Sequence, residues 1–221
     1  MQTSVRILET IPVTHNVRQY RLERPRGYDF TPGQATEVSI DREGWRDKKR
    51  PFTFTCLPDA DALEFTIKSY FDHTGVTNEL WSLGAGDKLI LRDVWGTIQF
   101  KGKGTFIAGG AGVTPFIAIL RHLNATGKIA GNRLIVSNRT EKDIILRDEF
   151  EAMAGLDVLW TVTDDPKSRL LQERIDADFL KAHVSDLSQN FYLCGPDPMV
   201  KDLRGLLEAA GADVGNVTWE K

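Results

Sequence analysis

The feature that most constrains the fold is a change of pattern near Gly102–Gly104. Before this point, short segments of alternating apolar and polar residues are separated by turns, which is typical of antiparallel strands. After it, apolar strands alternate with segments of helical periodicity, which favours a parallel sheet flanked by helices. A chain of 221 residues is long enough for two small domains. We therefore expect an N-terminal antiparallel β-barrel over residues 1–101 and a C-terminal α/β parallel-sheet domain over residues 102–221.

The elements expected in the first part are short strands and one short helix. The strands are predicted at Thr3–Glu9, Val17–Glu23, Thr36–Ile40, Phe52–Cys56, Leu63–Tyr70 and Lys88–Leu91, and the helix at Val76–Leu83. In the second part, strands are predicted at Thr105–Ala108, Leu134–Ser137, Asp157–Val162, Phe191–Cys194 and Val217–Glu220. The helices between them are predicted at Phe116–Leu123, Asp143–Met153, part of Leu170–His183, and Pro198–Ala210.

Composition excludes several classes of protein. A net charge of −3 argues against a nucleic-acid binder, which would carry a basic excess. Two distant cysteines and four scattered histidines lack the spacing of a zinc site or an iron–sulfur cluster. Any redox chemistry would therefore use an organic cofactor and no metal. No signal peptide and no run near ~20 apolar residues is found, so we expect a cytoplasmic protein without a transmembrane segment.

A glycine-rich run, Gly109–Pro115, lies where a predicted strand leads into a helix. Glycines allow a close backbone approach to a ligand, and the N–H groups of a helix N-terminus attract phosphate. Thr114 is expected as the N-cap, with Pro115 at the first helical position. The run lacks the Lys-Ser/Thr of a P-loop and the third glycine of a full GxGxxG motif. It is therefore either a nucleotide-binding turn or only a tight strand-to-helix turn.

Two runs in the first part have a similar character. Arg50-Pro51-Phe52-Thr53 offers an arginine for a pyrophosphate, a ring two residues later on the same face, and a hydroxyl donor. The Phe52 ring would stack on a flat cofactor or simply pack in the core. Gly75-Val76-Thr77 is a second possible phosphate site, or a simple glycine turn. Lys68 and Tyr70, at the end of the strand that precedes it, are further candidates for cofactor contact.

Taken together, these runs resemble the motifs of the ferredoxin–NADP reductase superfamily. Arg50-Pro51-Phe52-Thr53 resembles its flavin motif Arg-x-Tyr-Ser/Thr, and Gly75-Val76-Thr77 its pyrophosphate motif Gly-x-x-Ser/Thr. Gly109–Pro115 resembles the nicotinamide motif Gly-Gly-x-Gly-x-Thr-Pro, and Tyr192–Pro196 the late Cys-Gly-Pro motif. Asn138–Asp143 resembles the Asn-x-Thr-Glu-x-Asp run of the cytochrome b5 reductase branch. The motifs follow the family's order and cover nearly the whole chain.

The resemblance implies a flavin-binding barrel followed by an NAD(P)-binding domain. Arg50 would hold the flavin phosphates, Phe52 would stack on the isoalloxazine, and Thr53 would hydrogen-bond near its N5 atom. Cys194 would lie beside the nicotinamide C4 atom. The catalytic candidates are Thr53, Cys194 and Glu220; the cofactor-binding candidates are Arg50, Pro51, Phe52, Thr53, Lys68, Tyr70, Gly75, Val76, Thr77, Gly110, Gly112, Thr114, Ser137, Arg139, Cys194, Gly195 and Pro196.

Two departures from the family pattern stand out. Phe52 replaces the usual tyrosine, so a hydroxyl contact is lost while stacking remains. Many relatives carry a glutamate followed by a terminal aromatic that covers the flavin. Glu220 would match that glutamate, but the aromatic is missing, and Trp219 is a poorly aligned substitute. The nicotinamide would then reach the flavin with less displacement of a covering ring.

The function implied is a flavoprotein oxidoreductase that passes electrons from NAD(P)H through FAD, rather than FMN, to a separate one-electron carrier such as flavodoxin or ferredoxin. Ser137 and Arg139, with no acidic residue directly after their strand, favour NADPH, whereas the b5-reductase-like run favours NADH. A reductase of free flavin or small molecules is one alternative. A non-catalytic nucleotide-binding or electron-transfer subunit of a complex is another.

Overall fold

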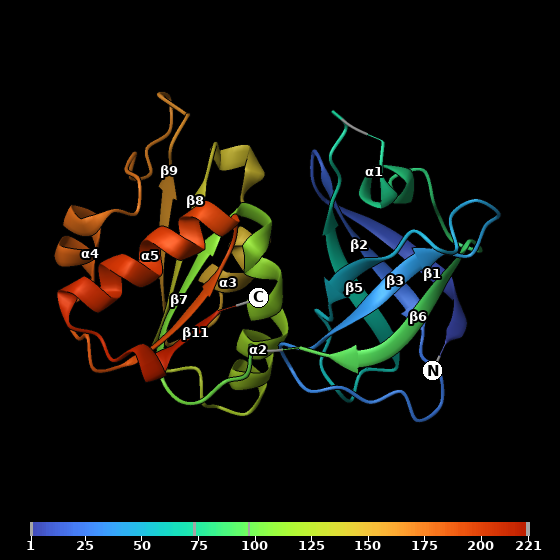
Figure 1. Cartoon of the computed structure of the whole chain (residues 1–221), viewed down its shortest axis with the longest axis horizontal. Coiled ribbons are helices and arrows are strands. Elements are labelled where there is room, and N and C mark those ends of the chain that lie inside the picture. The colour runs from blue at the N-terminus through green and yellow to red at the C-terminus, as the bar shows by residue number, and fades with distance from the viewer. Residues whose placement is uncertain (1, 73, 97, 220–221) are drawn as a thin grey trace. The chain divides into compact units, whose positions relative to one another are not determined.

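The computed structural model describes residues 2–72, 74–96 and 98–219 (Figure 1). The chain divides into two compact units, which we call the barrel unit and the sheet unit. The barrel unit is Met1–Gly96 together with Thr114–His122, and the sheet unit is Thr97–Val113 together with Leu123–Lys221. No helix in the described ranges is long and apolar enough to cross a membrane.

The barrel unit is built on six antiparallel strands in the order β4-β3-β6-β1-β2-β5. An antiparallel bridge between Phe54 and Phe65 brings the β4 side of this sheet to β5 and closes the barrel. The strands are β1 (Thr3–Thr14), β2 (Val17–Glu23), β3 (Ala35–Ile40), β4 (Arg50–Thr53), β5 (Ala62–Lys68) and β6 (Lys88–Trp95), with one helix, α1 (Val76–Leu80).

The strand β1 pairs with two different strands, because bulges bend it along its length. Its first residues, from Thr3 to Arg6, pair with β6, and the stretch from Ile7 to Thr14 pairs with β2. Register shifts at Ile7/Glu9 and Pro12/Thr14 mark β-bulges, which increase local twist and let a strand turn the corner of a barrel. Inside the barrel the Phe30 and Phe54 rings stack with centroids 4.3 Å apart. Burial of side chains of this size contributes about 1.5–3 kcal/mol each.

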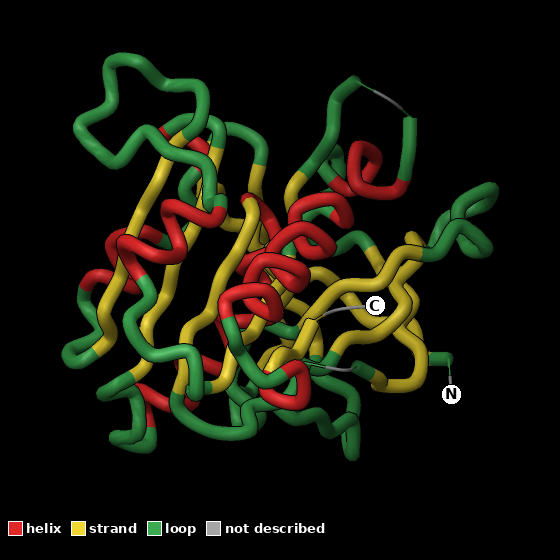
Figure 2. Tube along the Cα trace, turned by 60° about the vertical axis from the view of Figure 1, so that its left-hand side comes forward, coloured by secondary structure: helices red, strands yellow, loops and turns green. Residues whose placement is uncertain are grey.

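The sheet unit has five parallel strands in the order β11-β10-β7-β8-β9, drawn in yellow in Figure 2. From β7 the chain runs outward through β8 and β9, then returns to the other side of β7 as β10. Apolar residues of α4 and α5 share one core with β7, β8 and β10. The elements are β7 (Gly104–Gly109), α2 (Thr114–Ala125), β8 (Asn132–Asn138), α3 (Arg147–Glu151), β9 (Leu156–Val162), α4 (Ala177–His183), β10 (Asn190–Cys194), α5 (Asp197–Ala210) and β11 (Val217–Trp219).

Tyr192 fixes the start of the sheet unit to β10. Its hydroxyl accepts hydrogen bonds from the Lys101 and Gly102 amides and donates one to the Gly102 carbonyl. The ring stacks on Phe106 with centroids 4.4 Å apart, and burial raises the pKa of Tyr192 above its ordinary value. The strand that carries Cys194 is therefore well anchored.

The predicted fold class, an antiparallel barrel followed by a parallel helix-flanked sheet, is confirmed. The helix predicted over Asp143–Met153 is wrong in its extent. A capping box formed by Thr140 and Asp143 closes a short 3-10 turn, and α3 begins only at Arg147. Between them Ile144 and Ile145 are both buried, and Leu146 takes a left-handed φ of 52°, which a continuous helix does not allow.

Among the other boundaries that differ from the predictions, two concern the candidate motifs. The strand expected over Phe52–Cys56 lies at Arg50–Thr53, so it contains the whole Arg-Pro-Phe-Thr run. Helix α2 begins at Thr114 itself, because a turn of 3-10 helix, Gly110–Val113, leads directly into it. Thr114 is thus the first helical residue rather than the N-cap.

Candidate cofactor sites

Phe52 and Thr53 lie side by side on β4 and point to opposite faces of the strand. The Phe52 ring is half-buried at the margin of the barrel core, with its centroid 6.2 Å from that of Phe65. Thr53 is buried. Phe52 is therefore anchored on one side by the core and keeps part of its surface accessible, which suits a stacking role better than a fully buried ring would.

Arg50 carries a positive charge that no carboxylate neutralises within the described ranges. Its side chain is exposed, and its guanidinium donates to the Lys49 carbonyl at 2.8 Å. The nearby cations differ, since Lys49 pairs with Glu37 at 3.5 Å and Arg46 pairs with an aspartate at 2.7 Å. An arginine fork at the start of β4 that pairs with no carboxylate among the described residues is suited to bind a phosphate.

The Gly75 turn lies beside the end of β5. The Ser69 hydroxyl donates to the Thr77 carbonyl at 2.9 Å, which ties α1 to the residue after Lys68. From the Phe54–Phe65 bridge, the antiparallel direction of β4 carries Arg50 toward this same end of β5. Helix α1 has only 5 residues, so a phosphate here would depend on individual N–H groups and cations rather than on a helix dipole.

Lys68 and Tyr70 extend this group of candidates. Lys68 is half-buried, and its ammonium lies 5.9 Å from the centroid of the Tyr70 ring. Tyr70 is exposed. A cation and an accessible ring therefore stand at the end of β5 where the Gly75 turn begins.

In the sheet unit the candidate residues gather at the carboxyl ends of adjacent strands. Cys194 of β10 pairs with Ala108 of β7, and Gly109 of β7 pairs with Ser137 of β8. The chain reverses its direction of progress across the sheet between β7 and β10. In open α/β sheets, ligands bind outside the carboxyl ends of the strands at such a switch point.

The glycine-rich turn and the Cys-Gly-Pro turn pack against each other through their backbones. A Cβ at Gly112 would lie 2.3 Å from the Cys194 carbonyl oxygen and 2.6 Å from the Gly195 Cα. Gly195 itself has a φ of +157°, and a Cβ there would lie 3.0 Å from the Gly109 amide nitrogen. The two motifs are therefore halves of one structure. Gly110 has a φ of +53°, and a Cβ there would lie 4.0 Å from the Oδ1 atom of Asn138.

Three further candidates lie in or next to these two turns along the chain. Cys194 is buried, Pro196 precedes α5, and Thr114 begins α2 as part of the barrel unit. Cys194 forms no disulfide with Cys56. Glu220 lies outside the described residues. Trp219 pairs with Leu193 on the edge strand, and its ring is covered by the Arg204 guanidinium at 3.5 Å.

Arg139, expected to meet a 2′-phosphate, already has a partner. Its guanidinium donates to Asp164 at 2.7 Å, and both side chains are exposed. That hydrogen bond, followed by the charge of Asp164, raises the pKa of Arg139. Ser137 is half-buried at the end of β8. The acidic residue thus comes from the segment that follows β9, and for this reason the residues directly after β8 did not reveal it.

Asn138 is a residue that the sequence reasoning did not assign to the site. It ends β8 and is 6% exposed, and its side-chain Nδ2 atom has no hydrogen-bond partner in the part of the chain that the structure describes. A buried donor left unsatisfied costs about 1–3 kcal/mol. An unpaired donor at the carboxyl edge of a central strand fits a ligand that accepts hydrogen bonds there. The available signals were its position directly after the predicted strand Leu134–Ser137 and its place at the start of the Asn138–Asp143 run.

Comparison with known proteins agrees with a nucleotide-binding second half. Residues 106–205 match the family model described as the oxidoreductase NAD-binding domain. The reductase component of propane 2-monooxygenase from Mycolicibacterium goodii is 28% identical over 222 residues, covering 92% of this chain and 62% of that relative. NADH-cytochrome b5 reductase 1 from Rattus norvegicus is 28% identical over 238 residues, covering 89% of this chain and 78% of that relative.

Solved structures share the whole fold. A ferredoxin NADP+ reductase from Neisseria gonorrhoeae with bound FAD and NADP superposes with a TM-score of 0.86 at 21% identity, covering 99% of this chain and 98% of that one. The chain spans 62% of the length of the propane 2-monooxygenase reductase components from M. goodii and Rhodococcus jostii. The second half of the chain thus matches an oxidoreductase NAD-binding domain, and the chain as a whole has the two-domain fold of the ferredoxin NADP+ reductase that its motifs resemble.

Proposed function

We propose that this chain is an NAD(P)H-dependent flavoprotein reductase, with FAD held by residues 1–101 and the nicotinamide nucleotide by residues 102–221. The observation that carries the proposal is the junction of Gly112 with Cys194 and Gly195 at the switch point of the parallel sheet. Among the described residues, the Asn138 Nδ2 atom at the same edge has no hydrogen-bond partner and Arg50 in the barrel unit pairs with no carboxylate, and both fit anionic, hydrogen-bonding ligands.

Bound FAD supplies the redox chemistry, because a flavin accepts a hydride and releases electrons singly. The chain's own residues bind and orient. Arg50 would pair with the flavin phosphates, Phe52 would hold one face of the ring system, and Thr53 would hydrogen-bond at its edge. Cys194 would position the nicotinamide by its bulk, with Gly110, Gly112 and the Gly195-Pro196 turn fixing the backbone around it. No side chain is required as a strong acid or base.

We propose a separate one-electron carrier protein, such as a flavodoxin or a ferredoxin, as the acceptor. The names of the relatives support a protein acceptor, since one is a reductase component of a monooxygenase and another is a cytochrome b5 reductase. Screening flavodoxin, ferredoxin, cytochrome and free flavin as acceptors distinguishes this proposal from reduction of small molecules.

The direct test is anaerobic titration of the FAD-loaded protein with NADH and with NADPH in parallel. We expect one of the two nucleotides to bleach the flavin absorbance. A colourless protein that gains no chromophore on incubation with FAD or FMN would contradict the proposal. Nucleotide binding without bleaching would leave a sensing or accessory role instead.

Substitution of Cys194 by alanine is expected to slow flavin reduction about tenfold, because displacement of a reactant by a fraction of an ångström is costly. FAD affinity should not change. Stopped-flow reduction at saturating nucleotide measures the rate. Cys194→Ser keeps most of the side-chain volume, so its flavin reduction rate should fall less than that of Cys194→Ala. An unchanged rate in Cys194→Ala would contradict the positioning role.

Replacement of Asp164 by asparagine is expected to raise the kcat/KM ratio for NADPH over NADH several-fold. The change frees the Arg139 fork for a 2′-phosphate and removes a negative charge that would repel it. Asp157→Asn is the matched control, since it also breaks an Arg–Asp pair, of 2.9 Å, at the start of β9. Equal ratios in both variants would show that Arg139 does not contact the nucleotide.

A further inference from the structure

Helix α2 carries one charged side chain that enters a polar cluster of the barrel unit. The residues from Phe116 to Leu120 are all buried and apolar, and Arg121 follows them with its side chain only 20% exposed. The segment Thr114–His122 is part of the barrel unit, although the chain enters it from the sheet unit and leaves it to the sheet unit. Arg121 therefore lies on a helix shared in sequence by both units.

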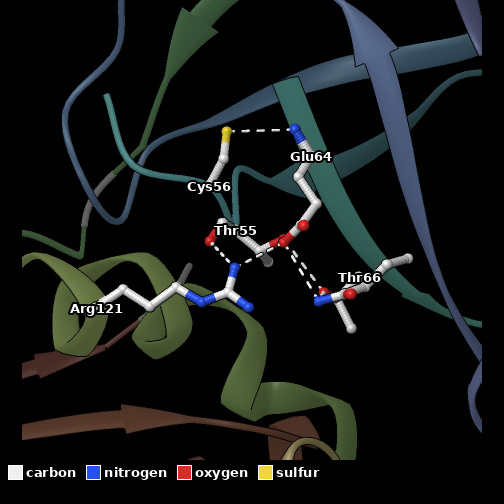
Figure 3. Close-up of polar contacts among 6 residues, drawn as sticks. Thr55, Cys56, Glu64, Thr66 and Arg121 are labelled. Carbon is white, nitrogen blue, oxygen red and sulfur yellow. Dashed lines mark hydrogen bonds and ion pairs between the residues drawn. The ribbon is translucent and has the colours of Figure 1, made fainter. Parts of the chain in front are cut away.

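The Arg121 guanidinium reaches two segments of the barrel at once (Figure 3). Its Nη1 atom donates to the Thr55 carbonyl at 2.7 Å and to the Glu64 Oε1 atom at 2.7 Å. The same carboxylate oxygen accepts from the Thr55 hydroxyl at 2.8 Å and from the Gln19 amide at 3.3 Å. The Thr66 hydroxyl donates to the Thr55 hydroxyl at 3.2 Å. We call these five residues the Arg121 cluster.

The Arg121 cluster is largely buried, and its buried side-chain polar atoms all have hydrogen-bond partners. Glu64 is 15% exposed, and none of the cluster's side-chain atoms is among the buried polar atoms that lack a partner. Charge-assisted hydrogen bonds are strong in such surroundings, and loss of either ion leaves the other poorly compensated. A polar network whose buried atoms all have partners favours one geometry. The cluster therefore holds α2 in one position against Thr55 and Glu64.

Thr55 and Arg121 are each close in sequence to a candidate site residue. Thr55 comes two residues after Thr53 and therefore points to the same side of the extended chain. Thr114 lies seven residues before Arg121, which is two helical turns, so the two share one face of α2. The turn Gly110–Val113 is covalently continuous with Thr114. The last residue of this turn is therefore directly followed by the first residue of the helix that Arg121 holds.

We infer that Arg121 is a positioning residue for hydride transfer, acting by holding α2, the helix that directly follows the glycine-rich turn in the chain, against Thr55 and Glu64 of its own unit. The inference rests on the proposed function. Arg121 itself need touch neither cofactor, because its hydrogen bonds go to Thr55 and Glu64. The expected signature is a loss of reduction rate at saturating nucleotide without loss of FAD affinity.

The test uses the full chain with two measurements on Arg121→Met, which keeps most of the aliphatic stem. In the cofactor-free protein, hydrogen exchange of the α2 amides should accelerate about tenfold, because local opening becomes easier. In the FAD-loaded protein, the limiting rate of flavin reduction should fall about tenfold. Arg121→Lys should show smaller changes in both the exchange rate and the reduction rate, since an ammonium can still pair with Glu64.

Arg147→Met is the matched control, because Arg147 pairs with Glu151 at 2.8 Å within α3 alone. Unchanged exchange and an unchanged reduction rate in Arg121→Met, or equal losses in Arg147→Met, would overturn the inference. If Arg121→Met does not fold, the same two measurements are made on Glu64→Gln. An unchanged exchange rate and an unchanged reduction rate in that variant would also overturn the inference. A parent protein that neither nucleotide reduces would refute the proposed function, while the exchange result would still decide whether Arg121 fastens α2.

Discussion

Gly112→Ala is expected to lower the rate of flavin reduction roughly 100-fold, the largest effect of any substitution considered, because misplacement by about 1 Å costs that much in rate. The added Cβ would lie 2.3 Å from the Cys194 carbonyl oxygen and 2.6 Å from the Gly195 Cα. Both are backbone atoms, so no side-chain rotation relieves the clash. Either the glycine-rich turn or the Cys-Gly-Pro turn must move, and both lie at the proposed nucleotide site.

The same substitution should cost stability, since overpacking of a close contact costs typically 1–3 kcal/mol. Gly205→Ala is the control. Gly205 lies within α5, where a Cβ meets nothing within 4 Å, so alanine should stabilise the protein by roughly 0.5–1 kcal/mol. The two variants should therefore shift the unfolding midpoint in opposite directions. Normal reduction kinetics in Gly112→Ala would mean that the junction does not hold the nucleotide.

The order of strands and helices could be predicted because each strand has a simple period of its own. Val17–Glu23 alternates along one strand, and the prediction matches the structure residue for residue. The strand β1 runs to Thr14, well past the predicted end at Glu9, because its bulges are set by pairing with two different partners. Likewise, Ile144 and Ile145 fit a helical pattern, but their burial is decided by the surrounding core.

The site motifs could be predicted one by one, but not their mutual dependence. Nothing in the sequence says that Gly112 is needed by the backbone of Cys194, since that contact is long-range. Arg121 within a largely apolar helix is normally interpreted as a solvent-facing residue, and only the fold brings Glu64 to it. Asp164 was missed for the same reason, because the pair with Arg139 joins the ends of adjacent strands.

Arg50→Ala is expected to weaken FAD binding about 10- to 100-fold, because hydrogen bonds to charged groups are worth about 1.5–3 kcal/mol and a phosphate would lose the arginine fork. The barrel itself should stay stable, since the exposed guanidinium donates only to the Lys49 carbonyl within the described ranges. Titration of the cofactor-free protein with FAD, followed by flavin fluorescence, measures the dissociation constant.

Lys49→Ala is the matched control, because it removes the adjacent positive charge while the lost partner is Glu37 rather than a phosphate. Its FAD affinity should change little. Arg50→Lys should fall between the parent and Arg50→Ala, since an ammonium keeps the charge but not the planar fork. Higher salt should reduce the difference in FAD affinity between the parent and Arg50→Ala, because salt screens exposed charges. Equal losses in Lys49→Ala and Arg50→Ala would indicate a diffuse positive field instead of a phosphate held by Arg50.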